Sequence, residues 1–169
     1  MRFCTLRSLQ LRTHWILAVL ITVALATLAC GGSGATSPTT TTGTSSNQTM
    51  TALIDGSAWT ALSVTASRAA NLISINGTDN SSPPRSIALS LIGASTGTYT
   101  MSAGASNAML RIGPIEGWSA NVLGGSGSII LTALSSTGAA GTFSFTAVPD
   151  GAASSSNQSV TSGTFNVRF

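Results

Sequence analysis

Carboxylates are the side chains after residue 30 that could most readily perform acid–base chemistry. Hydrolysis of a glycosidic bond needs two of them about 5–10 Å apart in a cleft. The four acidic residues are Asp55, Asp79, Glu116 and Asp150. The three aspartates each stand beside Gly or Asn, where Asp usually shapes a turn by accepting a backbone hydrogen bond. We therefore expect no catalytic residue, and a carboxylate-dependent glycoside hydrolase is the less favoured alternative.

The residue types that build most other active sites are missing after residue 30. The single histidine is His14, the sequence has no lysine, and Cys30 is the last cysteine. These absences exclude a Ser-His-Asp triad, a Cys–His or Ser–Lys dyad, a Schiff-base lysine and a His- or Cys-ligated metal in that part of the chain. We expect no metal ion and no cofactor. A calcium site that uses Asp55, Asp79 or Asn80 stays open, although no EF-hand ligand spacing is present.

Three aromatic side chains are candidates for ligand binding, namely Trp59, Tyr99 and Trp118. Together they could form a platform on which sugar rings stack, which would make the domain a carbohydrate-binding module. Single aromatic residues in strands more often pack into the core or its rim, because their large apolar rings gain most when buried. We therefore favour core packing and keep the carbohydrate-binding module as the alternative function.

Residues 1–30 have the pattern of an export signal that ends at a cysteine. Three arginines precede an uncharged run of 14 residues, 15–28, which Ala29 and Cys30 follow. A helix that spans a bilayer needs about 20 apolar residues, whereas a shorter run with basic residues before it is typical of a signal peptide. The sequence therefore predicts a signal peptide over residues 1–29.

The residues before Cys30, Ala-Thr-Leu-Ala at 26–29, resemble the lipobox of bacterial lipoproteins. The resemblance implies cleavage after Ala29 and transfer of lipid, including a palmitate-type acyl chain, to Cys30. Several acyl chains on one residue anchor a protein firmly in a membrane. Gly31 in place of Asp favours the outer membrane by the sorting rule of many such lipoproteins. An ordinary secretory signal with a free Cys30 and an uncleaved membrane helix are the alternatives.

The basic charge of the sequence belongs to this N-terminal segment. The formal net charge is +3, but after Cys30 four arginines stand against the four acids, which gives zero. A nucleic-acid-binding face needs clustered basic residues, so no nucleic-acid partner is expected. The expected partners are the membrane, through Cys30, and an envelope protein or a glycan.

Composition divides the rest of the chain into a tether and one folded domain. Residues 30–49 are rich in Gly, Ser and Thr and have no large apolar side chain, which predicts a disordered tether. From residue 50 onward, short apolar segments alternate with turn signals such as Asp55-Gly56. Residues 58–64 are expected to form a single strand, and Asn76-Gly77 a turn.

The aromatic residues of the last two predicted strands alternate with polar ones, which is the period of a strand. We expect one core lined by Phe143, Phe145, Phe165, Val167 and Phe169. Because helical periodicity is nearly absent and strands recur about every ten residues, residues 50–169 are predicted to be all-β. The expected fold is a small antiparallel β-sandwich or a barrel-like domain.

Several motifs of this domain resemble a family of exported β domains, domain of unknown function 6252. They are Ile54-Asp55-Gly56 with Trp59, Ile75-Asn76-Gly77-Thr78, Gly97-Thr98-Tyr99, residues 141–147 and Gly163-Thr164-Phe165-Asn166-Val167. The resemblance spans residues 50–169 and implies an all-β lipoprotein domain, without any activity. The sequence thus predicts a membrane-anchored, exported lipoprotein whose non-catalytic β domain has a binding or structural role at the cell envelope.

Overall fold

The computed structural model describes residues 41–43, 47–93, 95–151 and 154–169 of the chain. These residues form an antiparallel sheet of twelve strands and one short 3-10 helix, η1 (Met101–Ala103). The strands are β1 (Thr41–Gly43), β2 (Thr49–Ile54), β3 (Ser57–Thr60), β4 (Ser63–Ala69), β5 (Leu72–Thr78), β6 (Arg85–Ile92), β7 (Gly97–Thr100), β8 (Ser106–Ile112), β9 (Glu116–Ala120), β10 (Ser126–Leu134), β11 (Gly138–Pro149) and β12 (Gln158–Arg168).

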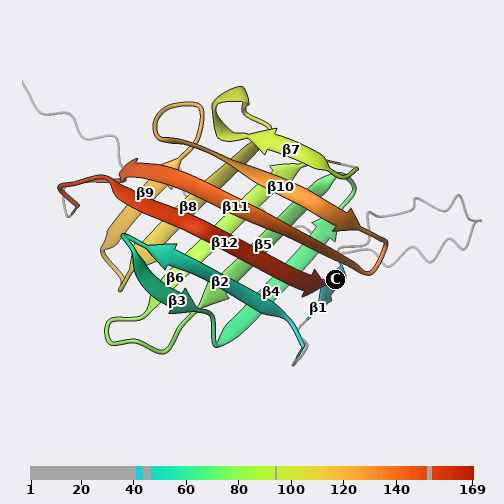
Figure 1. The fold of residues 1–169 in the computed structure, drawn as a ribbon, viewed down its shortest axis with the longest axis horizontal. Coiled ribbons are helices and arrows are strands. Elements are labelled where there is room, and N and C mark those ends of the chain that lie inside the picture. Colours follow the sequence, from blue (N-terminus) through green and yellow to red (C-terminus); the bar gives the residue numbers. More distant parts are fainter. Residues whose placement is uncertain (1–40, 44–46, 94, 152–153) are drawn as a thin grey trace, which may run out of the picture. The chain divides into compact units, whose positions relative to one another are not determined.

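The sheet curls so that two groups of strands face each other as layers (Figure 1). The back layer has the order β1-β4-β5-β6-β8-β9, and the front layer has the order β7-β10-β11-β12-β2-β3. The end of β11 joins the layers, because Val148 and Pro149 pair with Ser119 and Trp118 of β9. This curled half-barrel confirms the predicted all-β, antiparallel and barrel-like fold.

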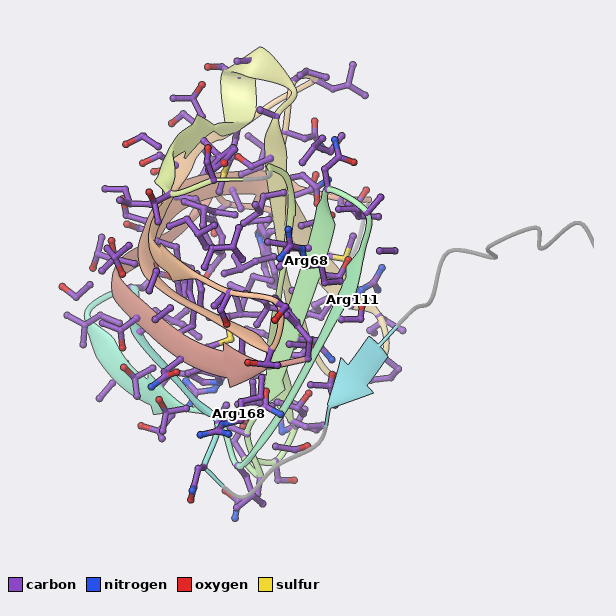
Figure 2. The ribbon with its side chains drawn as sticks, turned by 90° about the vertical axis from the view of Figure 1, so that its right-hand side faces the viewer. Arg68, Arg111 and Arg168 are labelled. Carbon is purple, nitrogen blue, oxygen red and sulfur yellow. The ribbon has the colours of Figure 1, made fainter. Side chains whose placement is uncertain are left out.

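Alternation along each strand fills the space between the layers with apolar side chains, as the end-on view in Figure 2 shows. Phe143, Phe145 and Phe165 are each 3% exposed, and their rings stack with centroids 6.3 and 6.4 Å apart. Val167 is also buried, and Phe169 is partly buried against the same cluster. The predicted core is therefore confirmed, and it is the β11–β12 part of a cluster to which both layers contribute.

The Asp55-Gly56 turn connects β2 to β3 as the sequence indicates. Asp55 has φ 48° and Gly56 has φ 80°, which are the two positive values of a type I′ hairpin turn. Gly and Asp adopt this conformation at low cost, and the turn matches the twist of the strands that it joins. The hairpin prediction is confirmed.

Residues 58–64 do not form the single strand that the sequence predicts. The backbone N–H of Ala61 donates to Met50 O in the front layer, whereas that of Leu62 donates to Thr78 O in the back layer, both at 2.9 Å. The chain therefore changes layer between Ala61 and Leu62, and β3 and β4 are separate strands. The sequence does not indicate this corner, because residues 58–64 are all apolar or small and include no Gly or Pro.

Part of the predicted tether belongs to the sheet. Thr41–Gly43 form β1, whose backbone pairs antiparallel with residues 66–68 of β4. The predicted signal peptide, Ala29, Cys30 and the rest of the tether up to residue 46 lie outside the described residues. Among the residues that the structure describes, no helix is long and apolar enough to span a bilayer.

Candidate functional site

The three aromatic candidates lie on different strands and do not form one platform. Trp59 of β3 and Trp118 of β9 are 2% and 4% exposed and belong to the core. Tyr99 of β7 is half-buried, and β7 and β3 are the opposite edges of the front layer. Neither indole offers a face to a sugar, because burial in the core stabilises an aromatic side chain more than exposure does.

Two of these aromatic residues donate hydrogen bonds to backbone carbonyls in neighbouring loops. The indole N–H of Trp118 donates to Ser156 O at 2.7 Å, and the Tyr99 hydroxyl donates to Ser95 O at 2.6 Å. The indole N–H of Trp59 is buried without a hydrogen-bond partner. Trp118 and Tyr99 thereby fix loops beside β11 and β7.

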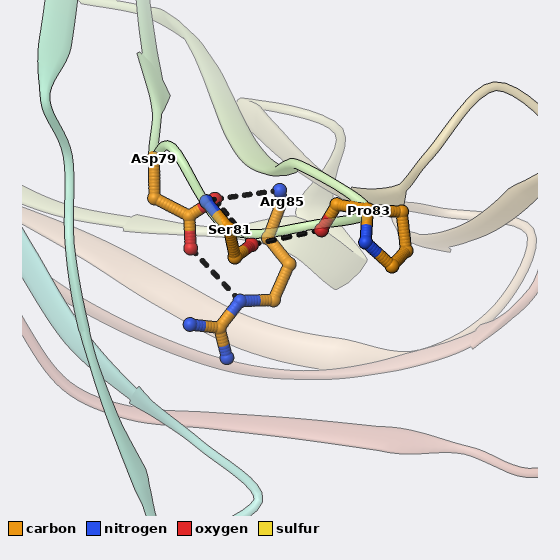
Figure 3. Close-up of polar contacts among 4 residues, drawn as sticks. All are labelled: Asp79, Ser81, Pro83 and Arg85. Carbon is orange, nitrogen blue, oxygen red and sulfur yellow. Dashed lines mark hydrogen bonds and ion pairs between the residues drawn. The ribbon is translucent and has the colours of Figure 1, made fainter.

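Asp79 organises the connection between β5 and β6 (Figure 3). Its Oδ1 accepts hydrogen bonds from Ser81 N at 3.2 Å, Ser81 Oγ at 2.7 Å and Arg85 N at 2.8 Å. Its Oδ2 pairs with Arg85 Nε at 2.9 Å. Ser81 Oγ also approaches Pro83 O at 2.8 Å. The prediction that Asp79 shapes a turn is confirmed, and the turn is closed by an ion pair.

The pKa of the Asp79 carboxyl is lowered from its ordinary value of 3.8. Burial by itself raises this pKa, because it disfavours the charged form. The hydrogen bonds from Arg85 and Ser81 favour the carboxylate and outweigh that effect. A carboxylate so held is a structural anion and not a poised general acid.

The other three acids occupy turns or strand ends. Asp55 Oδ1 accepts a hydrogen bond from Ser159 N at 2.8 Å, which ties the β2–β3 turn to β12. The backbone N–H of Asp150 donates to Gly117 O at 2.8 Å, next to Glu116. Among the described residues, no three His, Cys, Asp or Glu side chains gather as a metal site would require.

The outer face of the back layer has a shallow depression of about 280 Å³ over β4, β5, β6 and β8. We call it the back-layer depression. It is lined by Thr65, Ala66, Ser67, Ser74, Ile75, Asn76, Ala88, Leu89, Ser90, Asn107 and Met109. Its lining has no ionisable side chain, and it combines amides, hydroxyls and apolar groups.

Strand register places the outward side chains of this depression in two rows. One row crosses the sheet through Thr65, Asn76, Ala88 and Met109, and the next through Ser67, Ser74, Ser90 and Asn107. Successive residues within a row are about 4.8 Å apart, the spacing of neighbouring strands. The short side chains of Ala88 and Ser90 on β6 lie between Asn76 on β5 and the longer Asn107 and Met109 on β8.

The outer face of the front layer is coated with hydroxyl groups. A row of strand partners crosses it through Thr98, Ile130, Thr142, Thr164, Thr51 and Thr60. The hydroxyls of Thr51 and Thr164 are 2.9 Å apart. Beside the row lies a depression of about 360 Å³, lined by Ser128, Ile130, Thr142, Phe143, Ser144, Ser162, Gly163 and Thr164. This face also offers neutral polar contacts.

Sequence reasoning did not place Asn76 and Asn107 together on the outer face of the back layer. It predicted a turn at Asn76-Gly77, but β5 continues through both residues to Thr78. Gly77 is needed inside the strand, because a Cβ there would lie 2.8 Å from Met50 Sδ and 2.9 Å from the Trp59 ring. The alternation of Ile73, Ile75 and Gly77 toward the core was the signal that could have revealed the longer strand.

Comparison with known proteins places most of the described part in one family. A sequence model of the family described as Domain of unknown function (DUF6252) matches residues 46–167. No significant match was found among the curated proteins or among the solved structures. The family carries no activity in its description, so the role of the domain has to be argued from its surface.

Proposed function

We propose that this chain, which belongs to the DUF6252 family, is an exported lipoprotein anchored in a membrane through Cys30. Its β domain is a non-catalytic module with a binding or structural role at the cell envelope. The proposed lipid anchor and the proposed binding role rest on different observations, so an experiment can refute one without refuting the other.

The support for the anchor lies in the sequence. A basic start, an uncharged run of 14 residues and Ala29-Cys30 stand in the order that lipoprotein signal peptides have. Acyl chains on Cys30 would then hold the domain at the membrane surface. Gly31 favours delivery to the outer membrane.

The observation that carries the binding role is the neutral polar surface on the outside of the sheet. The back-layer depression and the front-layer threonine row present hydroxyls and amides, with no ionised side chain among them. Such a surface recognises neutral polar partners through hydrogen bonds, and it provides little long-range electrostatic steering. Asp79, the acid with a perturbed pKa, is already used to close a turn.

Metabolic labelling with an alkyne-bearing fatty-acid analogue tests the anchor directly. We expect the full chain expressed in a bacterial host to become labelled and to partition with membranes, whereas the Cys30→Ala variant remains unlabelled. The Cys4→Ala variant is the matched control and should label like the unmodified chain, because Cys4 lies within the predicted signal peptide. Label that persists in Cys30→Ala would refute the anchor.

A further inference from the structure

We propose that the back-layer depression binds a neutral saccharide, with Asn76 and Asn107 as its principal hydrogen-bonding side chains. Met109 and Ala88 provide the apolar contact for the carbon face of the sugar ring. The proposal rests on the binding role put forward above and names its ligand class and site. It does not use Trp59, Tyr99 or Trp118.

The shape of the depression suits a single sugar residue. Its volume of about 280 Å³ lies just below the range of small-molecule sites, which begins at roughly 300 Å³, so it has room for a small ligand only. Ala88 and Ser90 on β6 form part of a low floor between Asn76 on β5 and Asn107 on β8. The two amides are two strand spacings apart across the sheet and two residues apart along it, about 12 Å at the backbone, so a ring that lies diagonally between them can meet both.

The hydrogen-bonding groups of the depression are free to engage a ligand. Asn76 and Asn107 are exposed, and neither side chain hydrogen-bonds to another described residue. An amide has two donor hydrogens and an acceptor oxygen, so it can contact two neighbouring sugar hydroxyls at once. The hydroxyls of Ser74 and Ser90 add further donors and acceptors beneath them.

The lining of the depression matches a neutral ligand, because it contains no ionisable side chain. Arg68 is held away by hydrogen bonds from its Nη1 to Ser135 O at 2.9 Å and from its Nε to Ala70 O at 3.3 Å. Arg111 does not line the depression, and its Nε contacts Met109 Sδ at 3.2 Å. The lining itself therefore offers a ligand uncharged hydrogen-bonding groups, and the guanidinium of Arg111 stands at its border.

The front-layer depression is the weaker candidate for the same ligand. It has no amide side chain, and Thr164 on its wall already faces Thr51 at hydrogen-bond distance. Its lining is therefore limited to hydroxyls around Ile130, Gly163 and Phe143. The back-layer depression combines bidentate amides with a thioether and a methyl group, which fits the mixed polar and apolar surface of a sugar better.

Binding of the detergent-solubilised full chain to an array of neutral and acidic glycans tests the proposal. We expect binding to one or more neutral glycans, weakened roughly tenfold by Asn76→Ala or Asn107→Ala, since each removes hydrogen bonds to the ligand. Ala88→Trp, which fills the floor from the solvent side, should abolish binding. Asn157→Ala, at an exposed loop position outside the depression, is the matched control and should bind like the unmodified chain.

Far-UV circular dichroism of each variant verifies that the sheet is retained. Binding to no glycan, binding to acidic glycans alone, or binding that survives Ala88→Trp overturns the saccharide proposal. Fatty-acid labelling of Cys30 in the same preparation separates this failure from failure of the proposed anchor. A chain that is labelled at Cys30 but binds no neutral glycan would support the proposed anchor and refute the proposed saccharide site.

Discussion

At the scale of single residues, Asp79 shows how one of the few charged side chains after Cys30 stabilises a loop. Its side chain is 7% exposed and accepts hydrogen bonds from Ser81 and Arg85, which fix the loop between β5 and β6. Taking a carboxylate out of water is costly unless partners replace the lost hydration. Here the partners lie within six residues of Asp79, so the loop stabilises its own buried anion.

Replacement of Asp79 by Asn should destabilise the fold by about 2 kcal/mol at neutral pH, because Arg85 loses its charged partner. The lowered pKa of Asp79 means that its stabilisation is complete above its ordinary value of 3.8 and is lost as the pH falls through the lowered value. The gap in unfolding free energy between the two chains should therefore stay constant from pH 7 to about pH 5 and shrink below about pH 4. Urea unfolding across this range measures it.

Asp150→Asn is the control for that comparison, because Asp150 is exposed and its side chain makes no hydrogen bond to the described residues. Its stability should follow that of the unmodified chain at each pH. A gap for Asp79→Asn that is unchanged at pH 3 would contradict the assigned role of the ion pair.

Gly163 is the residue on β12 that lets the Phe143 ring lie against the backbone. A Cβ at Gly163 would lie 2.5 Å from two atoms of that ring, whereas one at Gly117 would meet nothing closer than 3.8 Å. Gly163→Ala should therefore destabilise the fold by about 1–3 kcal/mol through overpacking, and Gly117→Ala should be nearly neutral. Thermal unfolding of both variants measures the difference. Equal melting temperatures would contradict the predicted overpacking at Gly163.

At the scale of elements, the sequence predicted what depends on neighbours along the chain. Alternation located β11 and β12, and Asp55-Gly56 located the β2–β3 turn, because side-chain period and turn conformation are local properties. The corner at Ala61 and Leu62 could not be predicted, since it depends on hydrogen bonds to Met50 and Thr78 in different layers. The back-layer depression likewise depends on the register of four strands, which alternation alone does not determine.

Arg68 connects a strand of the back layer to a turn of the front layer. It lies on β4 in the back layer (Figure 2). Its Nη1 donates to Ser135 O at 2.9 Å, in the β10–β11 turn of the front layer. Arg68→Ala should lower the stability by about 1 kcal/mol and speed amide hydrogen exchange in residues 134–138, because the turn loses its tie to β4. Hydrogen-exchange mass spectrometry measures the change.

Arg111 is the matched control for Arg68. It is exposed on β8, and its side-chain contact is to Met109 of the same strand. Arg111→Ala should leave exchange in residues 134–138 unchanged. Equal exchange in the two variants would show that the contact between β4 and the turn contributes nothing to the rigidity of that turn.

At the scale of the whole domain, one apolar cluster holds both layers together. It draws on Trp59 and Phe143 from the front layer and on Ile75 and Trp118 from the back layer. Both cysteines of the sequence lie at or before residue 30, so no disulfide can staple the described strands to one another. The layers therefore depend on shared burial of apolar surface, which favours cooperative unfolding of the domain.

The two core tryptophans test this cooperativity, because Trp59 reports on the front layer and Trp118 on the back layer. Chains that carry Trp15→Phe with either Trp59→Phe or Trp118→Phe retain one reporter each. In each chain the urea transition followed by tryptophan fluorescence should coincide with that followed by far-UV circular dichroism, since a layer cannot lose the shared core alone. If the fluorescence of Trp59 changes at lower urea than the circular dichroism of the same chain, the front layer unfolds separately and the single-core argument fails.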